Sequence, residues 1–353
     1  MRCGMPTSLA VILVMAGTLV PAARAVVHGG GVGACNYCHV MHDPHGTVEQ
    51  PLLNGGTASD ICLSCHGAAY GAVLGVDALG PPPERGPGNF VFLTEDNLND
   101  GPDGITNPIG GDAAGHNIDA PAYGLATDGT RMTSPGGSYP ADSMQCTSCH
   151  DPHGNTNYRF LWGNGASPGG DGSFSGGAFD ATGLDLEAGG AESNSLHIAY
   201  RSGVSNWCGT CHGGYLDRHN RMGSSFRHRV DLTFSNRSAT QYNVYNGTLD
   251  PLGGSAATAY LAEIPFADPT TTTTSTVGPT MSSRVMCLSC HRAHASSAPA
   301  AGRWDFNIDT LGQDGVVSGS YTLPNPYGDP DQEPLCRKCH SGGQGGGHDS
   351  FVE

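Results

Sequence analysis

The stretch that determines the fold reads Cys146-Thr147-Ser148-Cys149-His150, and Asp151-Pro152-His153-Gly154 follows it directly. Two cysteines three positions apart, followed at once by histidine, form the attachment signature of a c-type haem. Each thiol of such a motif adds to one vinyl group of the porphyrin, and the adjacent imidazole then meets the iron as its proximal ligand. The stretch therefore predicts a covalently bound haem c.

The same five-residue pattern occurs six times and uses twelve of the thirteen cysteines. Zinc sites and disulfides also use paired cysteines, but neither gives a role to a histidine after every second cysteine. We therefore expect a hexahaem cytochrome c with six covalent haem c groups. The cysteines that would carry them are Cys35, Cys38, Cys62, Cys65, Cys146, Cys149, Cys208, Cys211, Cys287, Cys290, Cys336 and Cys339. The proximal iron ligands would be His39, His66, His150, His212, His291 and His340.

Residues 1–25 have the pattern of a signal peptide. Arg2 gives a positive start, residues 8–20 form an apolar run, and Ala23-Arg24-Ala25 is a small-x-small cleavage site. The run is shorter than the roughly 20 residues that a membrane-spanning helix needs. We therefore expect an exported protein in which residues 26–353 form a single hexahaem cytochrome c domain without a membrane span.

The composition favours an irregular fold. The chain holds 54 glycines and 24 prolines, and only 14% of its residues are charged. Neither helical nor strand periodicity is clear between the motifs. Six porphyrins are large apolar plates, however, and they can replace much of a side-chain core. We expect mostly irregular structure with haems forming the core, short helices at the haem motifs and few short strands.

The formal net charge of −16 excludes one class of partner. Binding to nucleic acid depends on Lys and Arg side chains that neutralise phosphates, and here 32 acidic side chains outnumber 16 basic ones. Such acidity keeps a protein soluble and would also suit docking to basic redox partners.

The number of histidines shows whether each iron could have a histidine as its second axial ligand. Sixteen histidines are present, and six of them follow the cysteines. Six bis-histidine haems need twelve, so the supply suffices with four left over. Methionine is the main competitor and would raise the reduction potential. The histidines outside the motifs are His28, His42, His45, His116, His153, His197, His219, His228, His294 and His348.

Three motifs carry a further histidine three residues after the proximal one, namely His42, His153 and His294. Residues i and i+3 lie on the same side of a helical turn. If the segment is helical, the second imidazole lies on the proximal side of its own haem and should bind a different iron. Only the first, third and fifth motifs have this feature, which suggests haems packed in pairs that exchange ligands.

Several segments around the motifs have a specific order and content. They are Val27-His28-Gly29-Gly30-Gly31-Val32, Gly115-His116-Asn117-Ile118, Pro135-Gly136-Gly137-Ser138-Tyr139-Pro140, residues 146–154, residues 287–296, Asn206-Trp207-Cys208 and Arg227-His228. Together they resemble the extracellular hexahaem cytochrome nanowires of the OmcS type. The connecting loops, including residues 155–200 and 237–280, do not obviously match.

The resemblance implies a homo-polymer of head-to-tail subunits with a continuous chain of bis-histidine haems. On the matching segments it implies the distal iron ligands His28, His42, His116, His153, His228 and His294.

The resemblance also implies that one distal ligand comes from the neighbouring subunit. On this chain that ligand is His42, which would bind the neighbour's fifth haem, held by Cys287, Cys290 and His291. His45 is the rival, because Asp43-Pro44-His45-Gly46 repeats the residues behind the third motif.

The leading functional interpretation is an electron conduit with no substrate of its own, and so not an enzyme. Its partners would be other redox proteins and extracellular electron acceptors, and it would be secreted to the cell surface or beyond. One alternative is a monomeric periplasmic electron carrier. Another is a multihaem reductase, which needs an iron with an open position. The familiar nitrite-reducing type has lysine in place of one motif histidine, and no such motif occurs here.

Overall fold

The structure is a computed structural model, and it describes residues 32–42, 45, 52–67, 73–74, 87–93, 114–155, 157–163, 181–183, 200–216, 230, 232–247, 250–270, 275–296, 298–306, 327 and 333–340. The expected signal peptide, residues 1–25, lies outside these ranges.

Short helices coincide with the haem motifs, as the sequence predicts. Four α-helices overlap the first, second, fourth and sixth motifs, and 3-10 turns form the third and fifth. The α-helices are α1 (Val32–Cys38), α2 (Ala58–His66), α4 (Val204–Gly209), α5 (Gly213–Leu216), α6 (Asn236–Val244) and α7 (Glu333–Arg337). The 3-10 helices are η1 (Phe90–Leu93), η2 (Pro121–Tyr123), η3 (Ala141–Ser143), η4 (Cys146–Ser148), η5 (Tyr158–Phe160), η6 (Ala256–Thr258), η7 (Cys287–Ser289) and η8 (Pro299–Ala301).

Strand structure is sparse in the described ranges. Strands β1 (Thr182–Gly183) and β2 (Tyr200–Ser202) form one antiparallel pair with an irregular register. Most other pairing consists of isolated bridges. The predicted fold class, a mostly irregular chain with short helices and few strands, is therefore confirmed.

Helix α2 shows how local sequence makes such short helices. Thr57 caps its start, because the Thr57 hydroxyl accepts the Asp60 backbone N–H at 3.1 Å and the Asp60 carboxylate accepts the Thr57 N–H at 3.2 Å. Gly67 ends the helix, and its N–H donates to the carbonyl of Leu63 at 2.8 Å. Capped ends fix the second haem motif within this single helix.

The side-chain core is divided into three apolar clusters. The first contains Phe90, Phe92 and Ile118, the second is built around Tyr242 and Phe266, and the third surrounds β2 and α4. Divided clusters fit the expectation that side chains supply only part of the core.

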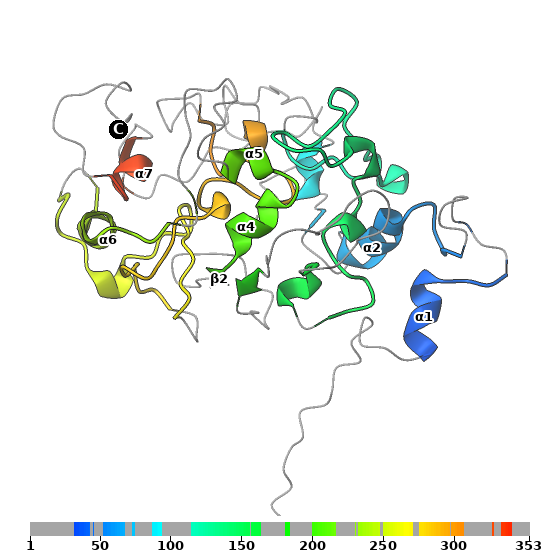
Figure 1. Ribbon diagram of the computed structural model, residues 1–353, viewed down its shortest axis with the longest axis horizontal. Helices are drawn as coiled ribbons and strands as arrows, with labels where there is room; N and C mark the ends of the chain where they lie inside the picture. The colour runs from blue at the N-terminus through cyan, green and yellow to red at the C-terminus, as the bar shows by residue number, and fades with distance from the viewer. Residues whose placement is uncertain are drawn as a thin grey trace, which may run out of the picture.

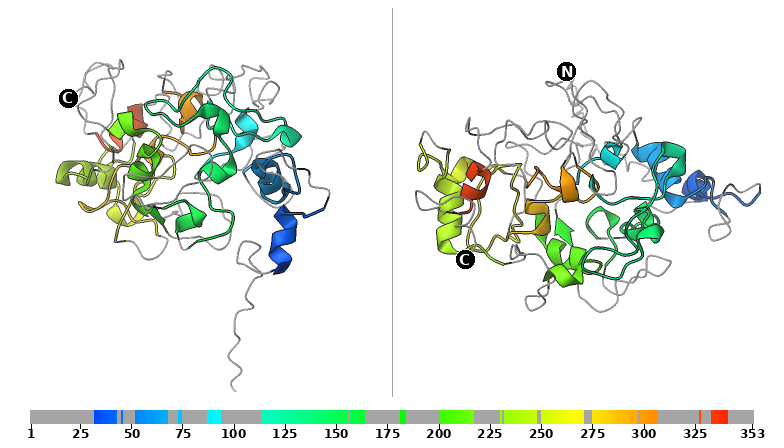
Figure 2. Two further views of the ribbon diagram at one scale, coloured as in Figure 1. Left: turned by 45° about the vertical axis from the view of Figure 1, so that its right-hand side comes forward. Right: turned by 90° about the horizontal axis from the view of Figure 1, so that it is seen from above.

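The motifs are distributed along the long axis of the molecule. Figure 1 shows α1 at one end and α7 at the other, with α2 and α4 between them. Figure 2 shows the same order from two further directions. No helix in the described part of the chain is long and apolar enough to cross a bilayer.

Candidate haem sites

The motif cysteines border the apolar clusters. Cys146 packs against the first cluster, Cys290 and Cys339 against the second, and Cys208 against the third. Burial raises the pKa of Cys149, Cys290 and Cys339 to about 12. The setting suits thioether bonds to an apolar plate.

The alternatives for paired cysteines find no support in this geometry. No disulfide joins the twelve motif cysteines. Within the described ranges, no group of three or more His, Cys, Asp or Glu side chains converges as a metal cage. A structural zinc site would need such a group of four ligands. The described cysteines form neither of these arrangements.

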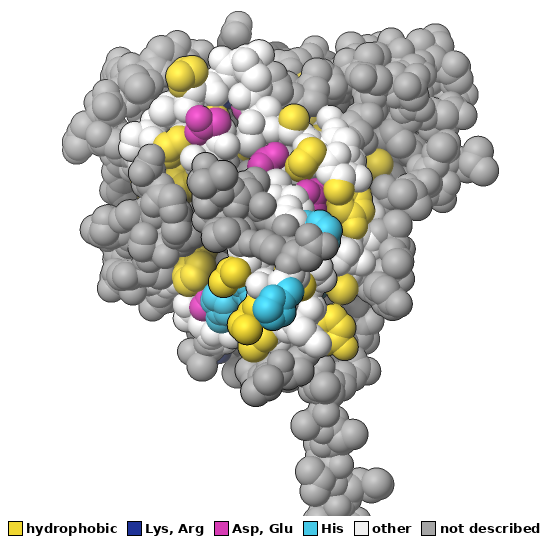
Figure 3. Space-filling view, turned by 90° about the vertical axis from the view of Figure 1, so that its right-hand side faces the viewer, with side chains coloured by type: hydrophobic (Ala, Val, Ile, Leu, Met, Phe, Trp, Pro, Cys, Tyr) yellow, Lys and Arg dark blue, Asp and Glu magenta, His cyan; other side chains and the backbone are white. Residues whose placement is uncertain are grey.

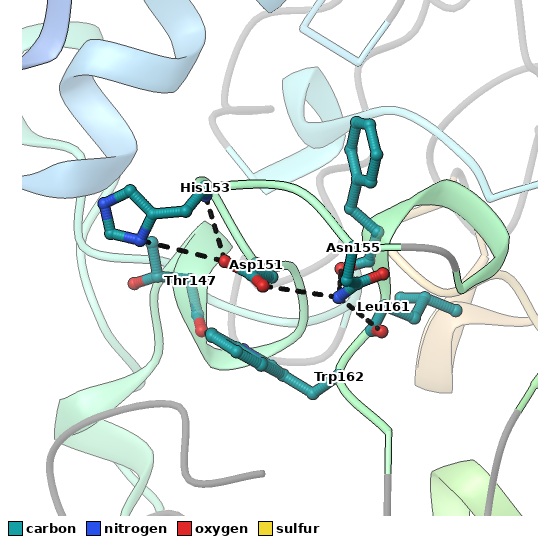
Figure 4. A network of polar contacts seen from close by, with 7 residues as sticks. Thr147, Asp151, His153, Asn155, Leu161 and Trp162 are labelled. Carbon is teal, nitrogen blue, oxygen red and sulfur yellow. Dashed lines mark hydrogen bonds and ion pairs between the residues drawn. The ribbon is translucent and has the colours of Figure 1, made fainter. Parts of the chain in front are cut away.

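The chain after the third motif folds back onto it (Figure 4). His150 pairs with Leu161 in an isolated antiparallel bridge. The next residue, Trp162, donates its backbone N–H to the carbonyl of Cys149 at 3.0 Å and its indole N–H to that of Thr147 at 2.7 Å. One residue thus holds the motif to the returning chain by two hydrogen bonds.

The fifth motif has the same returning loop with a different side chain. His291 pairs with Gly302 in an antiparallel bridge. Arg303 donates its backbone N–H to the carbonyl of Cys290 at 2.8 Å and its Nε–H to that of Leu288 at 2.7 Å. Arg303 therefore occupies the position that a tryptophan holds behind the third motif.

A third copy of the backbone pattern follows the first motif. His39 pairs with Leu53, and the backbone N–H of Asn54 donates to the carbonyl of Cys38 at 2.8 Å. The three motifs with a returning loop are the three that carry a histidine three residues further on. The helical premise for that spacing does not hold at the third motif, because residues 150–153 form a bridge and a turn.

Two of the returning loops each contain a pair of residues with left-handed backbone. This conformation costs roughly 1–3 kcal/mol for each residue that is not glycine. Their φ values are 51° for Arg159, 56° for Phe160, 57° for Ala300 and 53° for Ala301. The first residue of each pair supplies the carbonyl that meets the proximal imidazole. The conformation thereby orients an imidazole that is expected to bind haem iron.

Four imidazoles are oriented by a backbone carbonyl that lies at Nδ1. Because a carbonyl only accepts, Nδ1 carries the proton and the lone pair is at Nε2. That tautomer suits iron binding through Nε2. The pairs are His150 with Arg159 (2.9 Å), His291 with Ala300 (3.0 Å), His212 with Pro135 (2.7 Å) and His116 with Ala293.

Three of the histidines expected as proximal ligands each face a second histidine from another part of the chain. An imidazole nitrogen binds a metal at about 2 Å, so two imidazoles on opposite sides of one iron have ring centres about 6 Å apart. The observed spacings match this value, so the histidines present fit bis-histidine haems. The ring-centre separations are 6.2 Å for His39 and His153, 5.9 Å for His116 and His212, and 6.5 Å for His150 and His294.

Two of the facing histidines are held neutral. Burial, reinforced by neighbouring imidazoles, lowers the pKa of His294 to about 3 and that of His116 to about 4. Only a neutral imidazole has the lone pair that binds a metal.

These two histidines come from one crossing of the chain. Gly115 and Ala295 form an antiparallel bridge, and the backbone N–H of His116 donates to the carbonyl of His294 at 2.8 Å. A Cβ atom on Gly115 would lie 2.5 Å from the Ala295 Cα, so only glycine allows the crossing. From here one imidazole faces the third motif and the other faces the fourth.

The second motif supports the third. The hydroxyl of Ser59, in α2, accepts the backbone N–H of Cys146 at 3.1 Å. The thiols of Cys62 and Cys146 also lie against each other, as their mutual effect on each other's pKa shows.

The fourth motif supports the fifth in the same way. The hydroxyl of Ser205, in α4, accepts the backbone N–H of Cys287 at 3.2 Å, and the thiols of Cys208 and Cys287 are in contact. We call each such pair, α2 with η4 and α4 with η7, a helix–loop unit.

Several of the histidines considered as ligands lie at the surface. His42 and His45 are exposed, and the backbone N–H of His45 donates to the carbonyl of Leu53 at 3.0 Å. His66 and His340 are exposed as well. His28 and His228 lie outside the described residues.

Sequence reasoning missed four residues of these sites: Ser59, Ser205, Trp162 and Arg303. The two serines had a detectable signal, because each stands three residues before the first cysteine of its motif. Trp162 and Arg303 had none, since their equivalence rests on hydrogen bonds to the motif backbone.

Comparison with known proteins agrees with this geometry. The family described as "Doubled CXXCH motif" matches residues 27–70 and 139–169. The C-type cytochrome OmcS of Geobacter sulfurreducens is 30% identical, over 97% of this chain and 100% of that protein.

Two solved filament structures are also similar. The Outer Membrane Cytochrome S filament from Geobacter sulfurreducens has a TM-score of 0.67 and 25% identity, covering 89% of this chain and 99% of that one. A cryo-EM structure of the OmcS nanowires from the same organism has a TM-score of 0.65 at the same identity and coverage. With its repeated haem motifs and this match along nearly its whole length, the chain belongs to the OmcS-like family of multihaem c-type cytochromes.

Proposed function

We propose that the protein is an extracellular electron conduit and not an enzyme. Residues 26–353 would form one domain that carries six covalent haems and polymerises head to tail after removal of a signal peptide. The observation that carries the proposal is the set of three histidine pairs with ring centres about 6 Å apart, the spacing of two ligands on one iron. When bound, haem supplies one-electron chemistry, and irons with both axial positions filled have no place for a substrate.

The pairs assign three distal ligands. His153 would bind the iron of the first motif, His294 that of the third and His116 that of the fourth. Each ligand comes from a segment that belongs to a different motif or lies between motifs. Such exchange would hold neighbouring haems close together, which is what electron transfer along a chain needs.

The remaining distal ligands follow from the family resemblance. His28 and His228 would serve irons of this subunit, and His42 would bind the fifth haem of the neighbouring subunit. The exposure of His42 supports this role, because a ligand for another subunit must project from the surface. His291 would be the proximal ligand of that haem. Its ring contacts the ring of Phe306, with the two ring centres 5.4 Å apart.

The surface near His42 has the character of a contact between subunits. Tyr37 is 63% exposed, Met41 80% and Leu52 52%. Figure 3 shows histidine and hydrophobic side chains side by side on this end of the molecule. A second copy of the chain is the occupant that the filaments formed by the relative suggest.

The helix–loop units support head-to-tail assembly independently. The second motif supports the third and the fourth supports the fifth, which leaves the first motif, in α1, and the sixth, in α7, unmatched. These two lie at opposite ends of the molecule (Figure 1). A head-to-tail contact would join α7 of one subunit to the first motif of the next and so pair the two remaining motifs. Repetition of such a contact gives an open filament.

Negative-stain microscopy of the native protein, combined with the mass of the denatured chain, tests the proposal. We expect filaments, and a mass that exceeds the polypeptide by six haems. Monomers with six low-spin haems would support a periplasmic carrier instead. A high-spin haem that readily binds nitrite in the native protein would support a reductase.

A further inference from the structure

Arg303 places a permanent positive charge inside the loop of the fifth motif. Its side chain is 4% exposed. The Nε–H donates to the carbonyl of Leu288, within the motif, at 2.7 Å, and Nη1 donates to that of Ala262 at 3.0 Å. A guanidinium group stays protonated in proteins. The charge is therefore fixed beside Cys287 and Cys290 and shielded from water.

The equivalent positions in the other returning loops are neutral. Trp162 makes the same two hydrogen bonds behind the third motif, and Asn54 makes the backbone bond behind the first. A returning loop therefore forms with or without a side-chain hydrogen-bond donor, and it does not need a charged side chain. The charge of Arg303 is an addition that the shared architecture leaves unexplained.

Arg303 lies against the segment that would attach the haem. Its backbone N–H donates to the carbonyl of Cys290 at 2.8 Å, and its Nε–H donates to the carbonyl of Leu288, which stands between the two cysteines. Asp305, also buried, follows two residues later.

We propose that Arg303 raises the reduction potential of the fifth haem above that of the third. The inference rests on the proposed haem attachment at Cys287 and Cys290. On reduction, the ferric iron accepts one electron from a neighbouring ferrous haem, which is oxidised, and the site becomes less positive by one unit. A buried cation stabilises that reduced state, and burial and nearby charge are known determinants of haem potentials. Each subunit then contains a step in potential at a fixed place.

A reciprocal exchange in full-length holoprotein tests the proposal by potentiometric titration of the six haems. Arg303→Trp should shift the ferric–ferrous equilibrium of one haem about tenfold towards the ferric form. For one electron, this shift lowers the reduction potential of that haem by about 59 mV. Trp162→Arg should raise the potential of a different haem. Arg303→Lys, which keeps the charge, should stay close to the native value. If Arg303→Trp loses a haem, Arg303→Gln serves for the same measurement.

Unchanged potentials in a six-haem Arg303→Trp or Arg303→Gln protein would overturn the proposal. An equal fall in Arg303→Lys would also do so, because loop packing and not charge would then set the potential. Loss of a haem from both neutral variants would likewise overturn it, since Arg303 would be a structural requirement. Haem mass and filament images of the native protein test the proposed function separately, so the two failures are distinguishable.

Discussion

His39 and His153 face each other with ring centres 6.2 Å apart and ring planes within 9° of parallel. One belongs to the first haem motif and the other follows the third. The His153 backbone N–H donates to the carboxylate of Asp151 at 2.9 Å, which orients the segment (Figure 4). A residue beside one motif thus completes the surroundings of another.

Replacing His153 by alanine should leave the first haem with one axial ligand. We expect one of six ferric haems to become high-spin in the electron paramagnetic resonance spectrum, with the haem mass unchanged. His45→Ala is the control and should keep six low-spin haems. Six low-spin haems in the His153 variant would assign the ligand elsewhere.

Replacing His42 by alanine should abolish filaments, because the proposed iron–imidazole bond between subunits is lost. One haem per subunit, the fifth, should become high-spin and bind cyanide. His45→Ala should still polymerise in negative-stain images. Filaments from His42→Ala and monomers from His45→Ala would reverse the assignment, and filaments from both would remove the idea of a ligand from the neighbour.

Replacing both Cys146 and Cys149 by alanine should cause loss of the whole protein to proteolysis. The glycine-rich chain relies on haems to offset its conformational entropy, and Cys146 borders the first apolar cluster. Immunoblots of exported protein would measure the loss. A stable five-haem protein at normal yield would contradict this prediction.

Ser59→Ala should destabilise the helix–loop unit of α2 and η4. The Cys146 N–H would lose its buried acceptor, at a cost of roughly 1–3 kcal/mol. Ser205→Ala should have the same effect on the second unit, through Cys287. Ser138→Ala, at an exposed position outside the haem motifs, is the control and should leave the thermal transition unchanged. Equal transitions for all three variants would argue against the units.

Gly137→Ala should disturb the fourth motif. A Cβ atom there would lie 1.7 Å from the carbonyl oxygen of Cys211, so the backbone must move. Overpacking of this kind costs roughly 1–3 kcal/mol. Gly129→Ala, where nothing lies within 4 Å, is the control. Thermal unfolding followed by haem absorbance would compare them, and coincident curves would contradict the prediction.

The sequence alone predicts the fold class because the six motifs and the glycine content are local features. It also separates the first, third and fifth motifs from the others, through His42, His153 and His294. It does not predict which imidazoles meet, because the facing of His150 and His294 depends on the crossing at Gly115 and Ala295. Nor does it reveal that Trp162 and Arg303 are equivalent, since hydrogen bonds to carbonyls define that relation.

Because each helix–loop unit carries two haem motifs, a subunit could become longer or shorter by one complete unit at a time. Duplication or deletion of one unit would add or remove two haems and leave both terminal motifs intact. In the proposed filament, the junction between subunits likewise pairs two motifs, the one in α7 and the first motif of the next subunit. Chains with four, six or eight haems would then meet their neighbours through the same junction, and a wire built from them would keep its internal spacing.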